Sequence, residues 1–378
     1  HKILLLRQVD DFSLAAPNER LAKEIYDIIG KHLQLPSEKE PPFKYLGLTK
    51  DFNGVDVAQY DKSIAISVHN YIDRVMKTHH WDTPSSDETV KHGSPIPTDS
   101  LSQMYTEEGF DEGSTEHSEL ETEQGFGYRQ LLGELLYAYI TCRADIGYAV
   151  VTLSKFASKP GKFHFQMLKH TAIYLRKTKH WAIIFHKTKI DNGLPPNPFQ
   201  FLHGDESLPD FPTANENGLQ LSCFVDAAHA NDLRTRRSTT GYALHLSGGC
   251  ISYRCKTQSA TATSSTEAEF YAAVMAAKHT KYIRAVLTDL GFEQQSATPI
   301  YCDNQSTIKM VNSQIPTERS RHICVQWFAI QDWKKQGHVL LCFIQGIINP
   351  ADDLTKPLGW VLHSRHARRI MGHYMPST

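Results

Sequence analysis

Four carboxylates in the last third of the chain have the residue type and spacing that metal-dependent phosphate chemistry requires. They are Asp226, Glu269, Asp303 and Asp352. Carboxylates held together repel one another, so a cluster of four is stable only with cations among them. Carboxylate oxygens suit Mg²⁺, with Mn²⁺ as a substitute, and two such ions about 4 Å apart can flank a phosphate group. One ion then activates the attacking water and the other stabilises the leaving oxygen, so these residues are candidates for both metal binding and catalysis.

Glu269 also has an ordinary structural role open to it. It could complete an N-terminal capping box with Thr266, as Glu267 could with Ser264. The two glutamates lie about 200° apart around a helix, so at most one of them can face a metal. Spacing alone does not choose between them.

The other three acids have structural alternatives of their own. Asp303 could be a turn residue, and Asp352 with its neighbour Asp353 could complement the dipole at a helix N-terminus. Asp226 is the hardest to explain structurally, because strands disfavour Asp.

The elements predicted around these acids bring them to one edge of a sheet. Strands are expected at 220–230, 241–248, 250–256, 299–304 and 338–345, and helices at 265–290, 305–312, 320–337 and 350–362. Strand ends and helix starts at one sheet edge are where open α/β folds place their sites. Residues 219–358 are therefore predicted to form an α/β domain with a five-stranded mixed sheet and helices on its faces, followed by a C-terminal tail, 359–378.

The chain before residue 219 divides by composition. Within 1–84 we expect a strand at 2–9, a helix at 18–32, strand-like segments at 43–48 and 54–67, and a helix at 69–78. Residues 85–124 hold eleven acids against one base and are predicted to be a solvated acidic linker or large loop, ordered or disordered. Helical periodicity follows over 125–190, and the Pro-, Asn- and Gly-rich segment 191–218 is predicted to be a second linker.

Charge is strongly segregated although the net charge is only −1. Residues 143–190 carry ten Lys or Arg against a single acid, Asp145, with aromatic residues interleaved. A basic, aromatic helical face suits a phosphate backbone. A solvated helix surface whose aromatic residues face the core explains the pattern equally well. Both interpretations stay open.

Five strings in the last third of the chain carry a resemblance to a known family. They are FVDAAHANDLRTRRSTTGYALHL, SSTEAEFYAA, IYCDNQSTIKMVN, RSRHI and NPADDLTKPL. This region closely resembles the ribonuclease H (RNase H) part of copia-like retrotransposon polyproteins. The resemblance implies an RNase H-like fold, cleavage of the RNA strand of an RNA–DNA hybrid with two Mg²⁺, and catalytic roles for Asp226, Glu269, Asp303 and Asp352. After RSRHI the chain reads CVQWF, where the family usually continues with an acid and later a His, a departure that bears on substrate contacts.

The resemblance extends to the front of the chain. LLLRQVDDFSLA resembles the palm motif of reverse transcriptase, with Gln8 where the family usually has Tyr, and FKYLGL, YRQLLGELLYA and CRADIGYAVVTLSKF also match the family. It implies that Asp10 and Asp11 are two of the three metal-binding carboxylates of nucleotidyl transfer. Residues 1–84 would then be the end of a palm and the start of a thumb, and 125–190 a helical thumb or connection region. The third carboxylate would precede residue 1, so we expect an RNA-directed DNA polymerase in the intact parent and no polymerase activity in this chain.

The family implies three partners: an RNA–DNA hybrid, a template–primer, and the remainder of the retroelement polyprotein. Two other functions stay open, a decayed or non-catalytic hybrid-binding protein and an integrase- or resolvase-like nuclease, although STEAE after three strands and LTKPL argue against the latter. Seven cysteines without a CxxC pair indicate reduced thiols. Without an apolar run of eighteen residues or a signal-peptide pattern, we expect no membrane span and an intracellular location, in a cytoplasmic virus-like particle or the nucleus.

Overall fold

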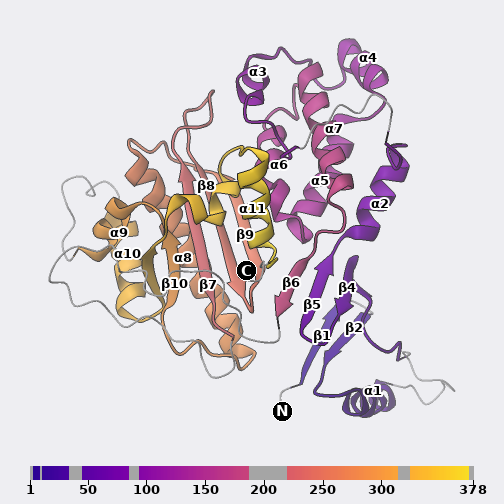
Figure 1. Cartoon of the computed structure of the whole chain (residues 1–378), viewed down its shortest axis with the longest axis vertical. Helices are drawn as coiled ribbons and strands as arrows, with labels where there is room; N and C mark the ends of the chain where they lie inside the picture. The colour runs from indigo at the N-terminus through magenta and orange to yellow at the C-terminus, as the bar shows by residue number, and fades with distance from the viewer. Residues whose placement is uncertain are drawn as a thin grey trace.

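The chain folds as two neighbouring parts, a C-terminal sheet with flanking helices and an N-terminal part rich in helices (Figure 1). This computed structural model describes residues 3–8, 11–33, 45–84, 93–186, 219–313 and 324–373. The predicted linker 191–218 lies outside the described residues, as does Asp10. In the described part of the chain, every helix is too short or too polar to cross a membrane.

The C-terminal part is built on the mixed five-stranded sheet that the sequence predicts. Its strands are β7 (Ser222–Ala228), β8 (Thr239–Leu246), β9 (Gly249–Thr257), β10 (Thr298–Cys302) and β11 (Val339–Phe343). The spatial order is β11-β10-β7-β8-β9, with β7, β8 and β9 antiparallel and β10 parallel to both β7 and β11. The prediction of a mixed α/β fold with this sheet is confirmed.

Helices cover both faces of this sheet. One face packs against α8 (Ser265–Asp289), α9 (Gln305–Asn312) and α10 (Cys324–Lys335). The other face is covered by η3 (Gly346–Ile348), η4 (Pro350–Leu354) and α11 (Trp360–Ile370). Small side chains on α8 allow its close approach to the sheet: Ala268, Ala272, Ala273, Ala276 and Ala277 are all buried.

The end of the chain departs from the prediction in two ways. The expected helix 350–362 is wrong, because the 3-10 turn η4 stops at Leu354 and α11 begins only at Trp360. Pro357 lies between them, and proline cannot supply the backbone donor that a continuous helix needs. The expected tail 359–378 is also wrong for its first part, since α11 buries His366 and Ile370 against the rest of the molecule.

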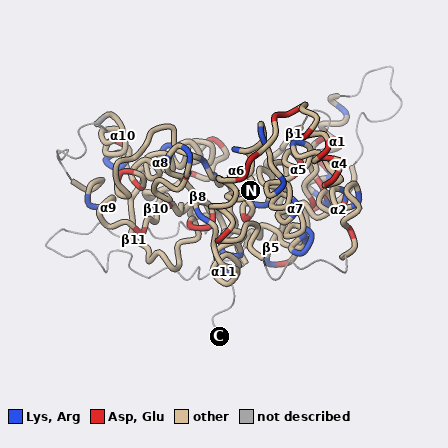
Figure 2. The backbone as a smooth tube through the Cα atoms, turned by 90° about the horizontal axis from the view of Figure 1, so that it is seen from above, with Lys and Arg blue, Asp and Glu red and all other residues tan. Residues whose placement is uncertain are grey.

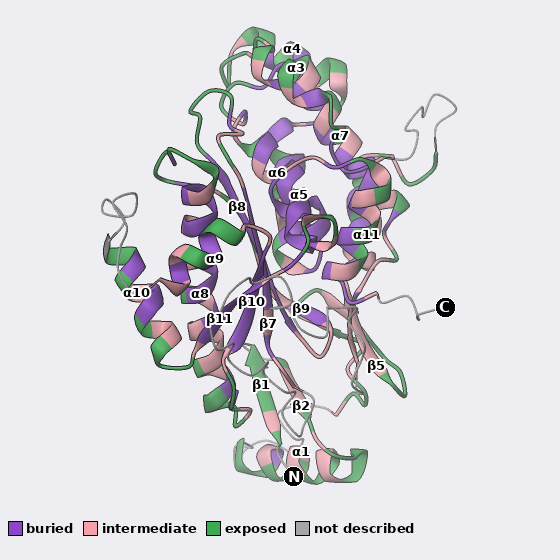
Figure 3. Cartoon of the chain, turned by 60° about the vertical axis from the view of Figure 1, so that its left-hand side comes forward, coloured by how far each residue is buried: buried purple, intermediate pink, exposed green. Residues whose placement is uncertain are grey.

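The helices predicted over 69–78 and 125–190 are present. They are α2 (His69–Thr78), α5 (Tyr128–Thr141), η1 (Ala144–Ile146), α6 (Gly147–Ser154) and α7 (Lys162–Lys177). A four-stranded sheet accompanies them, in the order β3-β4-β5-β6, from β3 (Asp51–Phe52), β4 (Val55–Gln59), β5 (Ser63–Ser67) and β6 (Ile183–His186). The helices share one hydrophobic core with the sheet domain, because Ala243, Cys255 and Leu354 belong to the same buried cluster as α5, α6 and α7 (Figure 3). The helical part and the sheet domain, which differ in composition, therefore share one buried core.

The acidic segment 85–124 is not a linker over its described residues 93–124. It contains α3 (Ser100–Thr106) and α4 (Thr115–Gln124), and it buries Ile96, Met104 and Leu120 in the helical core. Its acids face basic residues of the neighbouring segment: Lys159 pairs with Asp111 at 2.9 Å and Lys162 with Glu123 at 2.5 Å. The segment folds because its few apolar residues are buried in the core and its acids pair with lysines of the neighbouring segment. Its acidic composition alone predicts a solvated segment.

The N-terminal residues form a small separate unit. β1 (Leu4–Gln8) and β2 (Asp11–Ala15) pair as an antiparallel hairpin, followed by the predicted helix, α1 (Glu19–Leu33). The strand expected at 43–48 is wrong for its described residues 45–48, which have no regular structure.

Candidate active site

The fold brings the four predicted carboxylates to one edge of the five-stranded sheet. Ligand oxygens of Asp226, Asp303 and Asp352 all lie within 4.8 Å of one another. Glu269 and Asp303, with the thiol of Cys302, form a second group of the same compactness. Asp303 belongs to both groups, so the four acids make one continuous cluster.

Strand register places two of these acids side by side. β10 runs parallel to β7 with Tyr301 opposite Phe224, so Asp303 follows β10 at the level that Asp226 occupies on β7. Alternation along β7 points Val225 into the core under α8 and Asp226 to the opposite face. Asp226 is only 2% exposed, which is a costly place for a carboxylate that has no cation partner.

A glycine allows the last acid to reach the sheet. Gly241 on β8 pairs with Asp226, and a Cβ added there would lie 2.7 Å from the Leu354 Cβ and 2.7 Å from the Thr355 Cγ2. The absence of that side chain lets η4 pack directly on β8 and carries Asp352 to the cluster.

Two polar side chains fasten η4 to β7. Asn349 caps η4 by accepting a hydrogen bond from the backbone N–H of Ala351, and its Nδ2 donates to the carbonyl oxygen of Val225 at 2.9 Å. The hydroxyl of Thr355 donates to Asp226 Oδ2. Sequence reasoning missed Asn349, Thr355 and Gly241, although Asn before Pro-Ala-Asp-Asp is a recognisable helix-capping signal.

The structure separates the roles of the two glutamates on α8. Ser264 is the N-cap residue, and the Glu267 carboxylate accepts from the N–H and the hydroxyl of Thr263 at 2.7 and 2.6 Å. Glu267 therefore performs the capping. Glu269 is 5% exposed and points into the acid cluster, so the alternative that Glu269 is only a cap is wrong.

The cluster carries an excess of negative charge. Burial, and then the nearby carboxylates of Asp226 and Asp303, raise the pKa of Glu269 well above its usual value. Burial and Asp226 likewise raise the pKa of Asp303 to about 6, and they raise the pKa of Asp352. Each shift has the sign expected of carboxylates held together in a low-dielectric site.

Among the described residues, Lys356 is the cation that pairs with this cluster. Its Nζ lies 3.0 Å from Asp352 Oδ1 and 3.8 Å from Asp226 Oδ2. Burial alone would lower the pKa of Lys356, but the carboxylates of Asp226 and Asp352 outweigh it and raise this pKa. Within the part of the chain that the structure describes, this one ammonium group does not balance the four carboxylates when all are ionised, so their ionisation favours the binding of further cations.

The donor set fits Mg²⁺ or Mn²⁺. Carboxylate oxygens are hard ligands, and Asp226, Glu269, Asp303 and Asp352 supply them from four different elements. Burial raises the pKa of the Cys302 thiol well above its usual value, which keeps it protonated and makes it a poor ligand. Asp11, at the start of β2, is exposed and belongs to neither of the metal-compatible groups found among the described residues.

Known proteins resemble the chain in sequence. No protein-family model matches it. It is 27% identical over 356 residues to the retrovirus-related Pol polyprotein from transposon TNT 1-94 of Nicotiana tabacum, covering 94% of this chain and 23% of that protein. It is 29% identical over 243 residues to the corresponding polyprotein from transposon RE1 of Arabidopsis thaliana, covering 64% of this chain and 15% of that protein. The homologues that cover most of the chain are Pol polyproteins of copia-type plant retrotransposons. The predicted resemblance is thereby confirmed, and the chain spans less than a quarter of the length of these two relatives.

Solved structures resemble part of the chain. LC11-RNase H1, isolated from compost, matches with a TM-score of 0.29 and 13% identity, over 36% of this chain and 92% of that one. RNase H1 from the archaeon Halobacterium salinarum matches with a TM-score of 0.27 and 18% identity, over 36% of this chain and 94% of that one.

The basic residues predicted to form a nucleic-acid face are largely engaged in contacts within the chain. Arg143 is fully buried against Asp145, and ion pairs at 2.5 to 2.9 Å join Lys155 to Asp232, Lys159 to Asp111, Lys162 to Glu123 and Lys179 to Asp73. Phe156, Phe165 and Tyr174 are buried in the core. Basic and acidic residues are interspersed in both halves of the molecule (Figure 2). For these residues the structural interpretation holds.

Proposed function

We propose that the C-terminal domain is an RNase H that hydrolyses the RNA strand of an RNA–DNA hybrid, as part of a retrotransposon reverse transcriptase. The observation that supports this most directly is the compact carboxylate cluster on the predicted sheet, with Asp226, Asp303 and Asp352 within 4.8 Å. We assign residues 219–358, extended by α11, to this domain. The end of the palm is assigned to 1–84, with Asp10 and Asp11 as two of its metal ligands, and the thumb or connection region to 93–186.

Each of the four acids has a role in the proposed reaction. Asp226, Glu269, Asp303 and Asp352 would hold two Mg²⁺, which on binding lower the pKa of a coordinated water and offset charge at the phosphate. Asn349 and Thr355 fix the backbone of η4 and one oxygen of Asp226, so the ligands are oriented before metal and substrate arrive. Lys356, whose side chain is 40% exposed, adds positive charge at the mouth of the site, where the phosphate backbone of a hybrid would lie.

A cleavage assay tests this function. The whole chain is incubated with a labelled RNA–DNA hybrid and Mg²⁺ or Mn²⁺, alongside Asp226→Asn and Asp303→Asn. Asp289→Asn, at the exposed end of α8, is the matched control. We expect cleavage of the RNA strand by the wild type and the control, and a loss of about a thousandfold or more in the two cluster variants, because each removes a metal ligand.

The other outcomes of this assay identify the alternatives. Hybrid binding without cleavage, weakened by salt, would show a non-catalytic binding protein. Cleavage of double-stranded DNA would favour an integrase- or resolvase-like nuclease. Equal cleavage by the wild type and both cluster variants would contradict the proposed site.

A further inference from the structure

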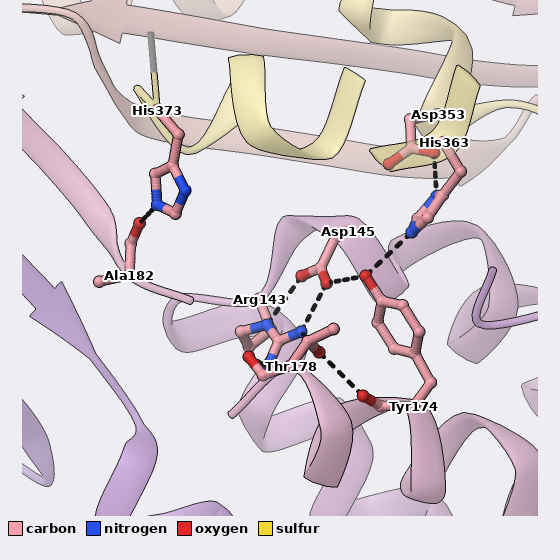
Figure 4. A network of polar contacts seen from close by, with 8 residues as sticks. All are labelled: Arg143, Asp145, Tyr174, Thr178, Ala182, Asp353, His363 and His373. Carbon is pink, nitrogen blue, oxygen red and sulfur yellow. Dashed lines mark hydrogen bonds and ion pairs between the residues drawn. The ribbon is translucent and has the colours of Figure 1, made fainter. Parts of the chain in front are cut away.

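A chain of buried polar groups connects the helical part of the molecule to the turn that carries Asp352 (Figure 4). Arg143 donates to both oxygens of Asp145, at 2.9 and 2.6 Å. The hydroxyl of Tyr174 donates to Asp145 Oδ2 at 2.6 Å and lies 2.9 Å from His363 Nε2. His363 Nδ1 lies 2.5 Å from Asp353 Oδ1, and Asp353 is the residue after Asp352.

The charge of Asp145 fixes the direction of the hydrogen bonds at its end of the network. Burial alone would raise the pKa of Asp145, but the guanidinium of Arg143 outweighs it and holds this pKa below its usual value, so Asp145 is a carboxylate and can only accept. The single hydroxyl proton of Tyr174 therefore goes to Asp145. The oxygen of Tyr174 must then accept from His363, whose imidazole carries a proton on Nε2. One further proton, on His363 Nδ1 or on Asp353 Oδ1, makes the hydrogen bond between these two atoms.

The network is buried and runs without a break from Arg143 to Asp353, where one oxygen, Oδ2, has no hydrogen-bond partner among the described residues. Arg143, Asp145, Tyr174, His363 and Asp353 are each 3% exposed or less. Buried charged groups are costly when one partner is lost, so a connected buried network holds its members in one arrangement. Four elements meet in it: η1, α7, α11 and η4.

Asp352 and Asp353 are neighbours in the five-residue turn η4, and their side chains serve different groups. Asp352 points into the acid cluster, 3.0 Å from Lys356, whereas Asp353 points into the network. A displacement of Asp353 moves the backbone that Asp352 shares with it. Packing adds to this coupling, because Leu354 of the same turn belongs to the helical core and lies against Gly147.

We propose that Tyr174 and His363 are positioning residues, which act through Asp353 to hold Asp352 where it binds metal. The inference rests on the proposed nuclease function and extends it: the helical part of the molecule, far away in sequence, sets the geometry of the metal site. The simpler alternative is that the network only holds the two parts of the molecule together. If the network positions Asp352, breaking one of its hydrogen bonds weakens metal binding. If it only holds the two parts together, breaking that bond lowers stability alone.

Tyr174→Phe is the decisive variant, with Tyr128→Phe as its matched control. Tyr174→Phe removes one hydroxyl, breaking the links to Asp145 and His363 at almost constant volume. Tyr128 is buried in the same core, and its hydroxyl donates to the carbonyl oxygen of Leu153 at 2.9 Å, with no link to η4. His363→Gln is a second variant that interrupts the network next to Asp353.

Mn²⁺ binding to the whole chain without nucleic acid is measured by electron paramagnetic resonance of the free ion, together with the melting temperature. We expect Tyr174→Phe and His363→Gln to bind Mn²⁺ about tenfold more weakly, which is the usual effect of removing a group that orients a metal ligand. The Mn²⁺ affinity of Tyr128→Phe should be unchanged. In hybrid cleavage, Tyr174→Phe should need about tenfold more Mg²⁺ and recover most of its kcat at saturating Mg²⁺.

Two results would overturn the inference in different ways. If the wild type binds Mn²⁺ through Asp226 and cuts hybrid, but Tyr174→Phe binds Mn²⁺ as tightly as Tyr128→Phe, the positioning role is wrong and the nuclease stands. If Asp226→Asn leaves Mn²⁺ binding unchanged, the metal site itself is wrong, and the positioning role fails with it.

Discussion

Two acids separated by a single residue have different roles on the same helix. Glu267 and Glu269 both follow a Ser or Thr by three positions, so local sequence offers each of them the same capping role. In the folded chain Glu267 accepts hydrogen bonds from Thr263 and Tyr271, while Glu269 lies among the acids. Only the direction that each side chain takes from the helix separates the capping role from the proposed role in metal binding.

Substitution of each glutamate by glutamine should separate these roles. Glu269→Gln replaces a carboxyl group that the metal-free protein holds protonated, so we expect loss of hybrid cleavage, because a metal ligand is lost, with little change in the stability of the metal-free protein. Glu267→Gln weakens the cap at the N-terminus of α8, so cleavage should persist while the free energy of unfolding falls by about 1 kcal/mol. Cleavage assays and denaturant titrations of the two variants measure both effects. Loss of cleavage in Glu267→Gln with activity in Glu269→Gln would reverse the assignment.

The repulsion within the cluster predicts how stability depends on pH without metal. The pKa of Asp303, raised to about 6 by burial and by Asp226, exceeds that of an unfolded Asp, about 3.9. At a pH between these two pKa values, the folded chain binds more protons than the unfolded chain. Protonation of Asp303 therefore contributes fully to stability below the unfolded pKa, and this contribution is lost as pH rises through about 6.

With EDTA present, the melting temperature should therefore fall as pH rises from about 5 to about 7.5, and Asp303→Asn should make this dependence shallower. Mg²⁺ should act in the opposite sense, because it binds the carboxylate form and stabilises the folded chain most at the higher pH. Differential scanning calorimetry at the two pH values tests both effects. A melting temperature that rises with pH in EDTA would contradict the predicted repulsion.

At the scale of elements, the position of η4 on β8 depends on one missing side chain. Gly241→Ala would place a Cβ 2.7 Å from the Leu354 Cβ and 3.0 Å from the Ala351 carbonyl oxygen, so η4 must shift. We expect a loss of about 2 kcal/mol in stability, typical of overpacking, and weaker Mn²⁺ binding because Asp352 moves with η4. Gly133→Ala is the control: it lies in α5 with nothing within 4 Å of the added carbon, and should raise stability by about 0.5–1 kcal/mol. Equal Mn²⁺ affinity in the two variants would show that η4 tolerates the added methyl group.

The elements that sequence predicts well are those with strong local patterns. Alternation and the turn at Ser247 and Gly248, both with positive φ, identify β8 and β9 as a hairpin. α4 has local signals as well, a Ser114 N-cap and a Gly125 C-cap with φ of 77°. Acidic composition concealed these signals, because the residues that balance its charge, such as Lys162, lie on a different element.

The sequence predicts the four acids of the candidate site but not the residues that hold them in place. The four acids follow from strand ends, helix starts and the family resemblance. Gly241, Thr355 and His363 support the site through partners on other elements, such as Asp226 and Tyr174. Periodicity and motif spacing describe neighbours along the chain, so they contain no information on such long-range pairs.

At the scale of the whole molecule, internal ion pairs change where nucleic acid should bind. Lys159 and Lys162 are engaged with acids of α4 and of the segment before it. The loop between β7 and β8 is a better candidate surface, because it carries the exposed residues Arg236 and Arg237. It lies beside the acid cluster, since Asn231 donates to the carbonyl oxygen of Thr355 at 3.0 Å, and Thr355 binds Asp226.

This arrangement predicts a difference between two double variants. Hybrid binding is measured in the Asp226→Asn background, in which we expect no cleavage. There, Arg236→Ala with Arg237→Ala should weaken hybrid binding. It should also reduce the slope of log affinity against log salt concentration by about one for each phosphate that the protein no longer neutralises. Lys159→Ala with Lys162→Ala removes the same charge from the helical part and should change that slope little. If the salt slope changes equally in the two double variants, or more in the lysine variant, the hybrid binds to the basic helical face and not to the β7–β8 loop. A selective effect of the arginine pair would place the phosphate backbone over the β7–β8 loop, where the scissile phosphate can reach the carboxylate cluster.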